Sequence, residues 1–389
     1  MGWSLSRKPG LTTHNPALSF KGYTVITVGD GLIYLIDMAG RVVHSWQVPG
    51  WKAQYAYFTD AGTILARGGP PRDPSIPFRQ AEENDELMPV EERCKMLPSN
   101  YQQLRELSWH SEILWEHEDP LLHHDFFQTK RDTFLVMRNI LVSPELSQKV
   151  RGWKRAKKGD HPLVADEYQE INRAGEVVWS VRLDELLDPV KDPIAVLERR
   201  IEWTHSNAIC ENPEGTKVLF SCKNISRVGI IDKATNTLDW RLGEPVISGQ
   251  HHARFLPNGH VHLFDNGTRK PGLPASRVAE IDPATDKVVW EYQANPPFSF
   301  FSPHISSADR LPNGNTFICE GASGRLFEVT RRGETVWEWH NPFTETVRNG
   351  QVNTSLWRAH RYSWQHPALA GRELGPDRFR ALNEMYGLA

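Results

Sequence analysis

The sequence predicts a six-bladed β-propeller, an all-β fold, on the basis of two observations. The first is a recurring pair of short apolar strands: one ends in a polar, usually acidic residue, a tight turn follows, and the next strand ends in tryptophan. The second is the spacing of these tryptophans, which lie roughly 50 to 70 residues apart, as in propeller blades with loop insertions. The six marker tryptophans are Trp46, Trp115, Trp179, Trp240, Trp290 and Trp337. A β-sandwich with an extra domain would not place one such tryptophan in every unit.

The copies of the strand pair cover most of the chain. They occupy residues 33–46, 168–179, 228–240, 278–290 and 326–337, with a degenerate copy at 108–115. We therefore expect a single domain over residues 1–389, with its blades at roughly residues 22–365.

Three insertions and a tail depart from the pattern. The segment at about 70–105 is rich in proline, glutamate and arginine and is predicted to form a lid with short helices. A second insertion covers about 142–164. In the third, at 183–200, leucine, isoleucine and valine recur at helical spacing and predict a small helix on a blade edge. The tail after Arg372 also has a helical pattern, so the fold is a propeller with helical insertions and a short C-terminal helical tail.

Composition excludes several classes of function. With 24% charged residues and a formal net charge of -3, the chain has no basic surface of the kind that binds nucleic acid. No stretch is apolar enough to serve as a signal peptide or to span a membrane. The four cysteines have no CxxC spacing, so neither a zinc motif nor a disulfide framework is expected. We expect a cytoplasmic protein acting on a small molecule, with no nucleic-acid or membrane partner and with its oligomeric state left open.

The 16 histidines give the strongest functional signal because they recur in phase with the repeat. After each marker tryptophan comes a link and then a strand predicted to be the innermost of the next blade, facing the central channel. Five of these six strands have histidine near their start. The histidines are His123–His124, His205, His251–His252, His304 and His360. A single buried histidine usually satisfies backbone groups, but five in register favour catalysis or metal binding.

Three kinds of chemistry fit such a cluster. Imidazole can act as nucleophile or general base, and a cation such as Arg269 could hold an anionic sulfate or phosphate group. Alternatively, the histidines could bind one divalent iron, copper or zinc ion. The candidate ligands are then His124, His205, His252, His304 and His360, with Asp125, Glu202 and Asp265 able to orient the rings. The third possibility is a binding propeller without catalysis.

Three elements together resemble the arylsulfotransferase family of six-bladed propellers. They are the Glu-Trp-Thr-His-Ser-Asn run at 202–207, Gly-Gln-His-His-Ala-Arg at 249–254, and Phe-Asp-Asn-Gly at 264–267 followed by Arg269. The resemblance extends from about residue 22 to 343. It implies an enzyme that moves a sulfuryl group from a phenolic sulfate to another phenol through a sulfated histidine, without a cofactor. His205, His251 and His252 would then bind the sulfate or the bridging oxygen, Asn207 would orient them, and Arg269 would hold the anionic oxygens.

The chain departs from that family in three ways. Well-studied members are exported, whereas this sequence has no signal peptide. The family's nucleophilic histidine is expected at 319–327, where this chain has none, and His304 is the best replacement. The surplus histidines His124, His304 and His360 are not needed for sulfuryl transfer. We therefore predict an arylsulfotransferase-like enzyme, with a metal-dependent propeller enzyme acting on a small aromatic or other organic substrate as the alternative. Of the neighbours His251 and His252, one should face the channel and the other pack between blades.

Overall fold

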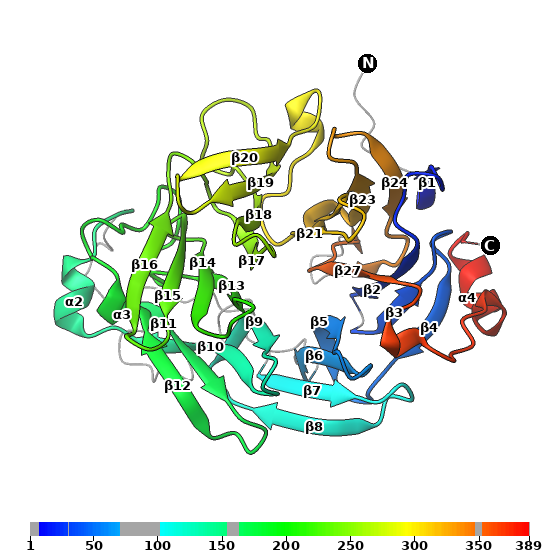
Figure 1. The fold of residues 1–389 in the computed structure, drawn as a ribbon, viewed down its shortest axis with the longest axis horizontal. Helices are drawn as coiled ribbons and strands as arrows, with labels where there is room; N and C mark the ends of the chain where they lie inside the picture. The colour runs from blue at the N-terminus through cyan, green and yellow to red at the C-terminus, as the bar shows by residue number, and fades with distance from the viewer. Residues whose placement is uncertain (1–7, 30, 71–101, 154–162, 347–351, 389) are drawn as a thin grey trace. The chain divides into compact units, whose positions relative to one another are not determined.

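The computed structural model describes residues 8–29, 31–70, 102–153, 163–346 and 352–388. It contains six antiparallel sheets of four strands each, one of them extended by a fifth strand, and this is the predicted six-bladed β-propeller fold (Figure 1). The chain divides into two compact units. Unit 1 comprises Met1–Pro74, Leu104–Glu116 and Phe300–Ala389, and unit 2 comprises Ser75–Gln103 and His117–Ser299. The single-domain prediction stays a prediction, and most of the predicted lid at 70–105 lies outside the described residues.

Unit 2 contains three sheets whose strands follow one another in chain order. They are β9 (Leu122–Gln128), β10 (Phe134–Leu141), β11 (Val164–Ile171) and β12 (Val177–Arg182); β13 (Ser206–Glu211), β14 (Lys217–Cys222), β15 (Arg227–Asp232) and β16 (Thr237–Leu242); and β17 (His251–Phe255), β18 (Val261–Asp265), β19 (Arg277–Asp282) and β20 (Lys287–Tyr292). Apolar side chains form two cores in this unit. One core contains Trp203 and Phe220, and the other contains Leu263 and Ile281.

Unit 1 contains the other three sheets. They are β5 (Lys52–Phe58), β6 (Ile64–Gly69), β7 (Gln103–Leu107) and β8 (Ile113–Glu118), whose two last strands run past the unit boundary; β27 (Ala359–Ser363), β2 (Gly22–Thr27), β3 (Ile33–Ile36) and β4 (Val42–Trp46); and β21 (Ser307–Arg310), β22 (Thr316–Glu320), β23 (Arg325–Val329), β24 (Thr335–His340) and the added β1 (Gly10–His14). A small two-stranded sheet pairs β25 (Glu345–Thr346) with β26 (Val352–Asn353).

The predicted repeat has a physical basis in the turns. In several sheets the third strand ends in aspartate, whose carboxylate accepts backbone N–H groups of the following turn, as Asp232 does from Ala234 and Thr235. In unit 2, two marker tryptophans on fourth strands reach the corresponding turn of the next sheet. The indole of Trp179 donates to Asn236 at 2.8 Å, and that of Trp240 donates to Asp286 at 2.8 Å. These two tryptophans therefore join neighbouring sheets.

All six marker tryptophans lie on the fourth strand of their sheets, as predicted. We call this fourth strand the outer strand and the edge strand at the other side of the same sheet the inner strand. The inner strands are β5, β9, β13, β17, β21 and β27. His304, predicted to lie near the start of an inner strand, instead precedes β21 (Ser307–Arg310).

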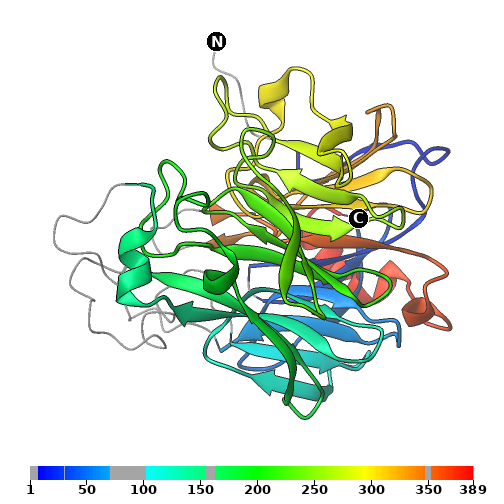
Figure 2. The same cartoon turned by 60° about the vertical axis from the view of Figure 1, so that its left-hand side comes forward.

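The chain ends are tied into the sheets of unit 1. Strand β27, late in the sequence, completes the sheet of β2, β3 and β4 by pairing with β2, and the orange-red C-terminal segment lies against this blue sheet in both views (Figures 1 and 2). Helix α4 (Arg380–Met385) follows the 3-10 turn η4 (Pro376–Phe379), as the tail pattern predicted. Asn383 of α4 bonds to both backbone groups of Val42.

The other helices are short. Helix α2 (Pro144–Lys149) lies in the second insertion and is capped by the Ser143 hydroxyl. The third insertion forms only one helical turn, α3 (Leu183–Leu186), so the helix expected over 183–200 is much shorter than predicted. Pro189 and Pro193 follow closely, and proline ends a helix because it lacks an N–H donor. Three further 3-10 turns are η1 (Pro297–Ser299), η2 (Gly321–Ser323) and η3 (Pro367–Leu369).

Candidate functional site

The inner strands of unit 2 share an unusual backbone at their histidines. His124, His205 and His252 have positive φ values of 45°, 50° and 51°, at or next to the beginning of β9, β13 and β17. The pairing register shifts beside each, as in a β-bulge. A non-glycine residue in the left-handed region costs about 1 kcal/mol or more, and bulges of this kind re-aim side chains next to active sites. The same strained geometry at three equivalent histidines marks this region as the candidate site.

His205 is the most accessible of these three residues. Its Nδ1 lies 2.8 Å from Oε2 of Glu202, and its side chain is 15% exposed. A neutral imidazole that donates Nδ1–H to a carboxylate keeps its lone pair on Nε2. Among the described residues, Nε2 of His205 has no hydrogen-bond partner. The Glu202–His205 pair therefore presents an oriented nitrogen nucleophile or base.

The His124 ring lies edge-on to that of His205, with the ring centroids 4.5 Å apart. Behind it, Nδ1 of His124 is 2.9 Å from Nδ1 of His123, whose Nε2 is 3.1 Å from Oδ1 of Asp166. Asp166 also accepts the backbone N–H of Ser206. Burial alone would raise the pKa of Asp166, but its interactions with His123 and Ser206 lower it, so this buried group is a carboxylate. Asp166 thus orients His123 and, through it, the His124 ring, and it also fixes the segment that follows His205.

Asn207 and Asn266 position the pair on β17. The Asn207 amide donates to the backbone carbonyl of Gln250 at 2.8 Å, directly before His251. Nδ1 of His251 lies 2.8 Å from Oδ1 of Asn266. Both histidines of the pair are buried, and His252 is completely so. Asn207 therefore orients the strand that carries these histidines, whereas the ring of His251 is held by Asn266.

Arg269 is embedded among polar partners. Its guanidinium donates to Glu198 at 2.6 Å, to Glu244 at 3.3 Å, to the Ser226 hydroxyl and to the carbonyl of Lys223 at 3.0 Å. The backbone N–H of Lys223 in turn donates to the carbonyl of His205 at 3.1 Å. Arg269 therefore supports the segment beside His205, and its charge is already compensated by carboxylates.

Asp125, which follows His124, is a buried tie between the three inner strands of unit 2. Its carboxylate accepts the backbone N–H of Ile209 at 3.0 Å and pairs with Arg254 at 2.9 Å. Asp265 accepts the backbone N–H of Ser248 and pairs with Lys270 and Arg277. Both carboxylates thus support the loops and strands of the site, whereas Glu202 pairs with His205.

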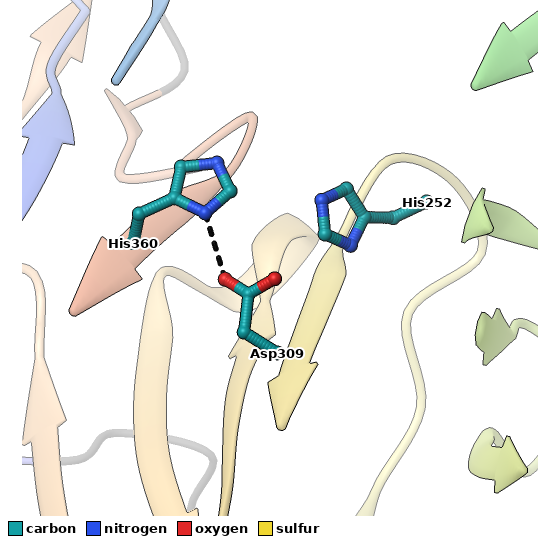
Figure 3. Close-up of side chains that lie close together, drawn as sticks. All are labelled: His252, Asp309 and His360. Atoms are coloured by element: carbon teal, nitrogen blue, oxygen red, sulfur yellow. Dashed lines mark hydrogen bonds and ion pairs between the residues drawn. The ribbon is translucent and has the colours of Figure 1, made fainter. Parts of the chain in front are cut away.

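The remaining predicted histidines lie in unit 1. His304 is exposed and precedes β21, and its carbonyl accepts the Ser302 hydroxyl at 2.8 Å. His360 on β27 is bonded through both ring nitrogens: Nδ1 lies 2.7 Å from Oδ2 of Asp309, and Nε2 lies 2.8 Å from the Tyr55 hydroxyl. Figure 3 shows the bond between His360 and Asp309; His252, also drawn there, belongs to unit 2.

The described part of either unit, taken alone, has no three His, Cys, Asp or Glu side chains close enough together to hold a metal ion. The described cysteines are buried free thiols, and burial raises the pKa of Cys210 to about 11. A thiol with so high a pKa is a poor nucleophile at neutral pH. Chemistry at these sites therefore centres on imidazole, carboxylate and phenol groups.

The family model described as "Arylsulfotransferase (ASST)" matches residues 33–247 and 245–356, most of the chain. The chain belongs to the arylsulfotransferase family. No curated protein matches it significantly. It is similar in structure to a protein of unknown function from Bacteroides caccae, with a TM-score of 0.53 at 15% identity over 88% of this chain and 98% of that one. A β-propeller domain of Cps50 (Swd1) from Myceliophteria thermophila gives a TM-score of 0.46 at 12% identity over 87% and 88%. The first likeness supports the fold alone.

Family membership supports an arylsulfotransferase-like transferase. Among the described residues, no helix is long and apolar enough to cross a membrane. Of the site residues that sequence predicted for this family, unit 2 contains His205, Asn207, His251, His252 and Arg269, whereas His304 lies in unit 1. Sequence reasoning missed Asp166, Asn266, Asp309 and Tyr55. Only Asn266, inside the Phe-Asp-Asn-Gly element, carried a local signal. The other three reach their histidines from different strands.

Proposed function

We propose that this arylsulfotransferase-family enzyme transfers a sulfuryl group between phenols, with His205 as the nucleophile that carries it. The observation that supports His205 most strongly is its pairing with Glu202 at 2.8 Å, which leaves Nε2 as a partly exposed lone-pair nitrogen. Nε2 attacks the sulfur of an aryl sulfate, an N–S bond forms, and the S–O bond to the leaving phenolate breaks. The oxygen of an acceptor phenolate then attacks sulfur, a new S–O bond forms, and the N–S bond breaks to restore the neutral His205 ring. Such an intermediate divides one difficult transfer into two easier steps.

The groups around His205 have distinct roles in this proposal. Glu202 fixes the tautomer and stabilises positive charge on the ring as the N–S bond forms. The edge of the His124 ring, oriented through His123 and Asp166, packs against His205 and limits its rotation. Arg269 is a positioning residue, because it holds Lys223, which in turn bonds to the carbonyl of His205.

The test uses metal-free protein, a chromogenic aryl sulfate as donor and phenol as acceptor. His205→Gln should lower the transfer rate by about 10³-fold or more, because loss of a covalent nucleophile leaves only binding and electrostatic effects. The matched control is His110→Gln, the same exchange at an exposed histidine, which should leave the rate unchanged. Equal rates for His205→Gln and the wild type would exclude His205 as the carrier.

A metal-dependent enzyme is the second candidate, supported by the close rings of His124 and His205. Zinc, iron and copper accept imidazole nitrogens as ligands, and water or substrate could fill the other positions on the metal. Metal analysis of protein purified without added ions tests it. About one equivalent of metal that disappears in His124→Ala would favour this candidate, whereas metal-free protein with full transferase activity would exclude it.

A further inference from the structure

A surface groove of unit 1 has a volume of about 640 Å³, within the range of small-molecule sites. It is lined by residues 16–21 in the link between β1 and β2, by Asn313 and Asn315 in the turn between β21 and β22, by Thr330 after β23, and by residues 363–365 at the end of β27. All of these residues belong to unit 1. The groove shares no residue with the histidine sites described above.

The wall formed by the link between β1 and β2 is held in place by hydrogen bonds. The Asn315 amide donates to the carbonyl of Leu18 at 2.8 Å and to the carboxylate of Glu328 at 2.6 Å. The same carboxylate accepts the backbone N–H of Phe20 at 2.8 Å. Glu328 is in turn paired with Arg361, and both side chains are completely buried. The groove is therefore preformed, as ligand sites usually are.

Trp364 lines this groove and is 60% exposed. It is the only exposed tryptophan in the part of the chain that the structure describes. Within those same residues, no side chain or backbone group bonds to its indole or stacks on its ring. Tryptophan is usually well buried, because burial of its large ring contributes strongly to stability. An exposed indole in a preformed groove therefore offers a stacking surface to a planar ligand.

Lys21 is the neighbour of Trp364 across the strands. Gly22 of β2 pairs with Ser363 of β27 in antiparallel register, so the next residues, Lys21 and Trp364, lie opposite one another. A Cβ atom at position 22 would collide with the carbonyl of Tyr362, so the two strands approach closely there. Lys21 is exposed, and its ammonium group has no partner among the described residues. Because the described lining contains no acidic residue, Lys21 gives the groove an uncompensated positive charge.

We infer that this groove binds a small aromatic anion, with the ring of the ligand on Trp364 and its negative group at Lys21. Aromatic rings stack on indole, and a flexible ammonium group pairs with a compact anion such as a sulfonate or carboxylate. The exposed Gln365 side chain, which has no hydrogen bond within the described residues, adds an amide donor beside them. A neutral sugar would not use Lys21, and an inorganic anion would not use Trp364. Such binding is independent of the proposed sulfuryl transfer at His205 in unit 2.

The probe is naphthalene-2-sulfonate, an aromatic anion whose sulfur is bonded to carbon and therefore cannot be transferred. Calorimetric titration of the full-length protein measures its affinity. Trp364→Ala should weaken binding by about 10-fold or more, because it removes the stacking surface. Trp364→Phe keeps an aromatic ring and should retain most of the affinity. The matched control is Phe298→Ala, which removes an exposed ring outside the groove and should leave the affinity unchanged.

The charge is tested with Lys21→Gln. An exposed ion pair contributes little, so this variant should lose about 2- to 5-fold in affinity at low salt. The difference from the wild type should shrink as salt is added, because ions screen exposed charges. Lys287→Gln, the same exchange at an exposed lysine of β20, is the control and should bind the probe as the wild type does.

Two further ligands separate the contributions of ring and charge. The ring without the charge is 2-naphthol, and the charge without the ring is methanesulfonate; both should bind more weakly than the probe. Only binding that Trp364→Ala removes is counted, because a phenol or a sulfonate can also enter the site of His205.

An affinity for the probe that Trp364→Ala leaves unchanged, or no binding at millimolar concentration, would overturn the aromatic site. Equal affinity for 2-naphthol and the probe, with no loss in Lys21→Gln, would overturn the anionic part. Neither result bears on the proposed function, because the rate of sulfuryl transfer by the same protein is measured separately with an aryl sulfate and phenol.

Discussion

The two units have the same blade topology but equip their inner strands differently. In unit 2, left-handed histidines stand at the start of all three inner strands, and the ring of His205 is held by a carboxylate three residues away. In unit 1, the imidazole of His360 is joined by long-range contacts to Asp309 and Tyr55. One region offers a nitrogen with an open lone pair, and the other a nitrogen enclosed between a carboxylate and a phenol. The same blade topology thus holds its histidines through a neighbour in sequence in one unit and through long-range partners in the other.

The largest loss of stability should follow the removal of Asp125, the buried carboxylate that joins the three inner strands of unit 2. Asp125→Ala leaves the Arg254 guanidinium and the Ile209 N–H without their carboxylate, because Asp125 binds both. Removing one partner of a buried ion pair destabilises by about 3–5 kcal/mol. Chemical denaturation should show this loss in the free energy of unfolding. Asp239→Ala, which removes a half-exposed aspartate paired with Lys217, is the control and should cost under about 1 kcal/mol.

Glu202→Gln tests how far the histidine site depends on its carboxylate. The amide can still accept a hydrogen bond from Nδ1 of His205 but cannot stabilise a positive ring, so the transfer rate should fall by about 10- to 100-fold, the usual cost of losing such an orienting partner. Steady-state kinetics with the chromogenic sulfate measures the change. A rate equal to that of the wild type would remove Glu202 from the mechanism.

His44 in unit 1 contrasts with His205, because its ring is packed against tryptophans. Its ring stacks on Trp109 with centroids 3.9 Å apart, and burial lowers its pKa to about 4. The unfolded chain, with an ordinary pKa of about 6.5, therefore binds a proton that the folded chain excludes. Stability from this residue is complete above pH 6.5 and is lost as the pH falls toward 4, by roughly 3 kcal/mol. Urea unfolding at several pH values gives the free energy of unfolding as a function of pH. Between pH 6.5 and 4 this free energy should fall less steeply in His44→Gln than in the wild type.

The smallest effect concerns the backbone at position 205. Asparagine tolerates the left-handed region better than alanine does. His205→Asn and His205→Ala should be equally inactive, yet the asparagine variant should be more stable by about 0.5–1 kcal/mol. Thermal unfolding compares them directly. A more stable alanine variant would mean that position 205 does not adopt a left-handed backbone in solution.

The fold followed from the sequence because its signals are local and repeated. The turn built on Asp232 and the marker tryptophan Trp240 that follows it are close together in the sequence, and the period of such pairs gives the blade number. Two predictions about the described elements were wrong. The small helix predicted at 183–200 forms only one turn, because helical spacing was given more weight than Pro189 and Pro193. The segment around His304 precedes an inner strand, which begins only at Ser307.

The site was only partly predictable because its residues act through partners on other strands. The phase of the repeat indicated His205 and His360, and Glu202 could be named because it is close in sequence. Nothing local linked Tyr55 to His360 or Asp166 to His123. Nor could the sequence show that three histidines adopt a backbone usually left to glycine, because that strain is imposed by strand pairing.

The central claim, that His205 carries the sulfuryl group, is tested most directly by trapping the intermediate. Protein mixed with an aryl sulfate and no acceptor, then quenched at alkaline pH and digested, can be mapped by mass spectrometry. The account predicts one sulfuryl group on the peptide that contains His205, absent from His205→Gln and lost when phenol is added before quenching. A sulfuryl group on another residue, or a protein that turns over aryl sulfate without any modified histidine, would contradict it.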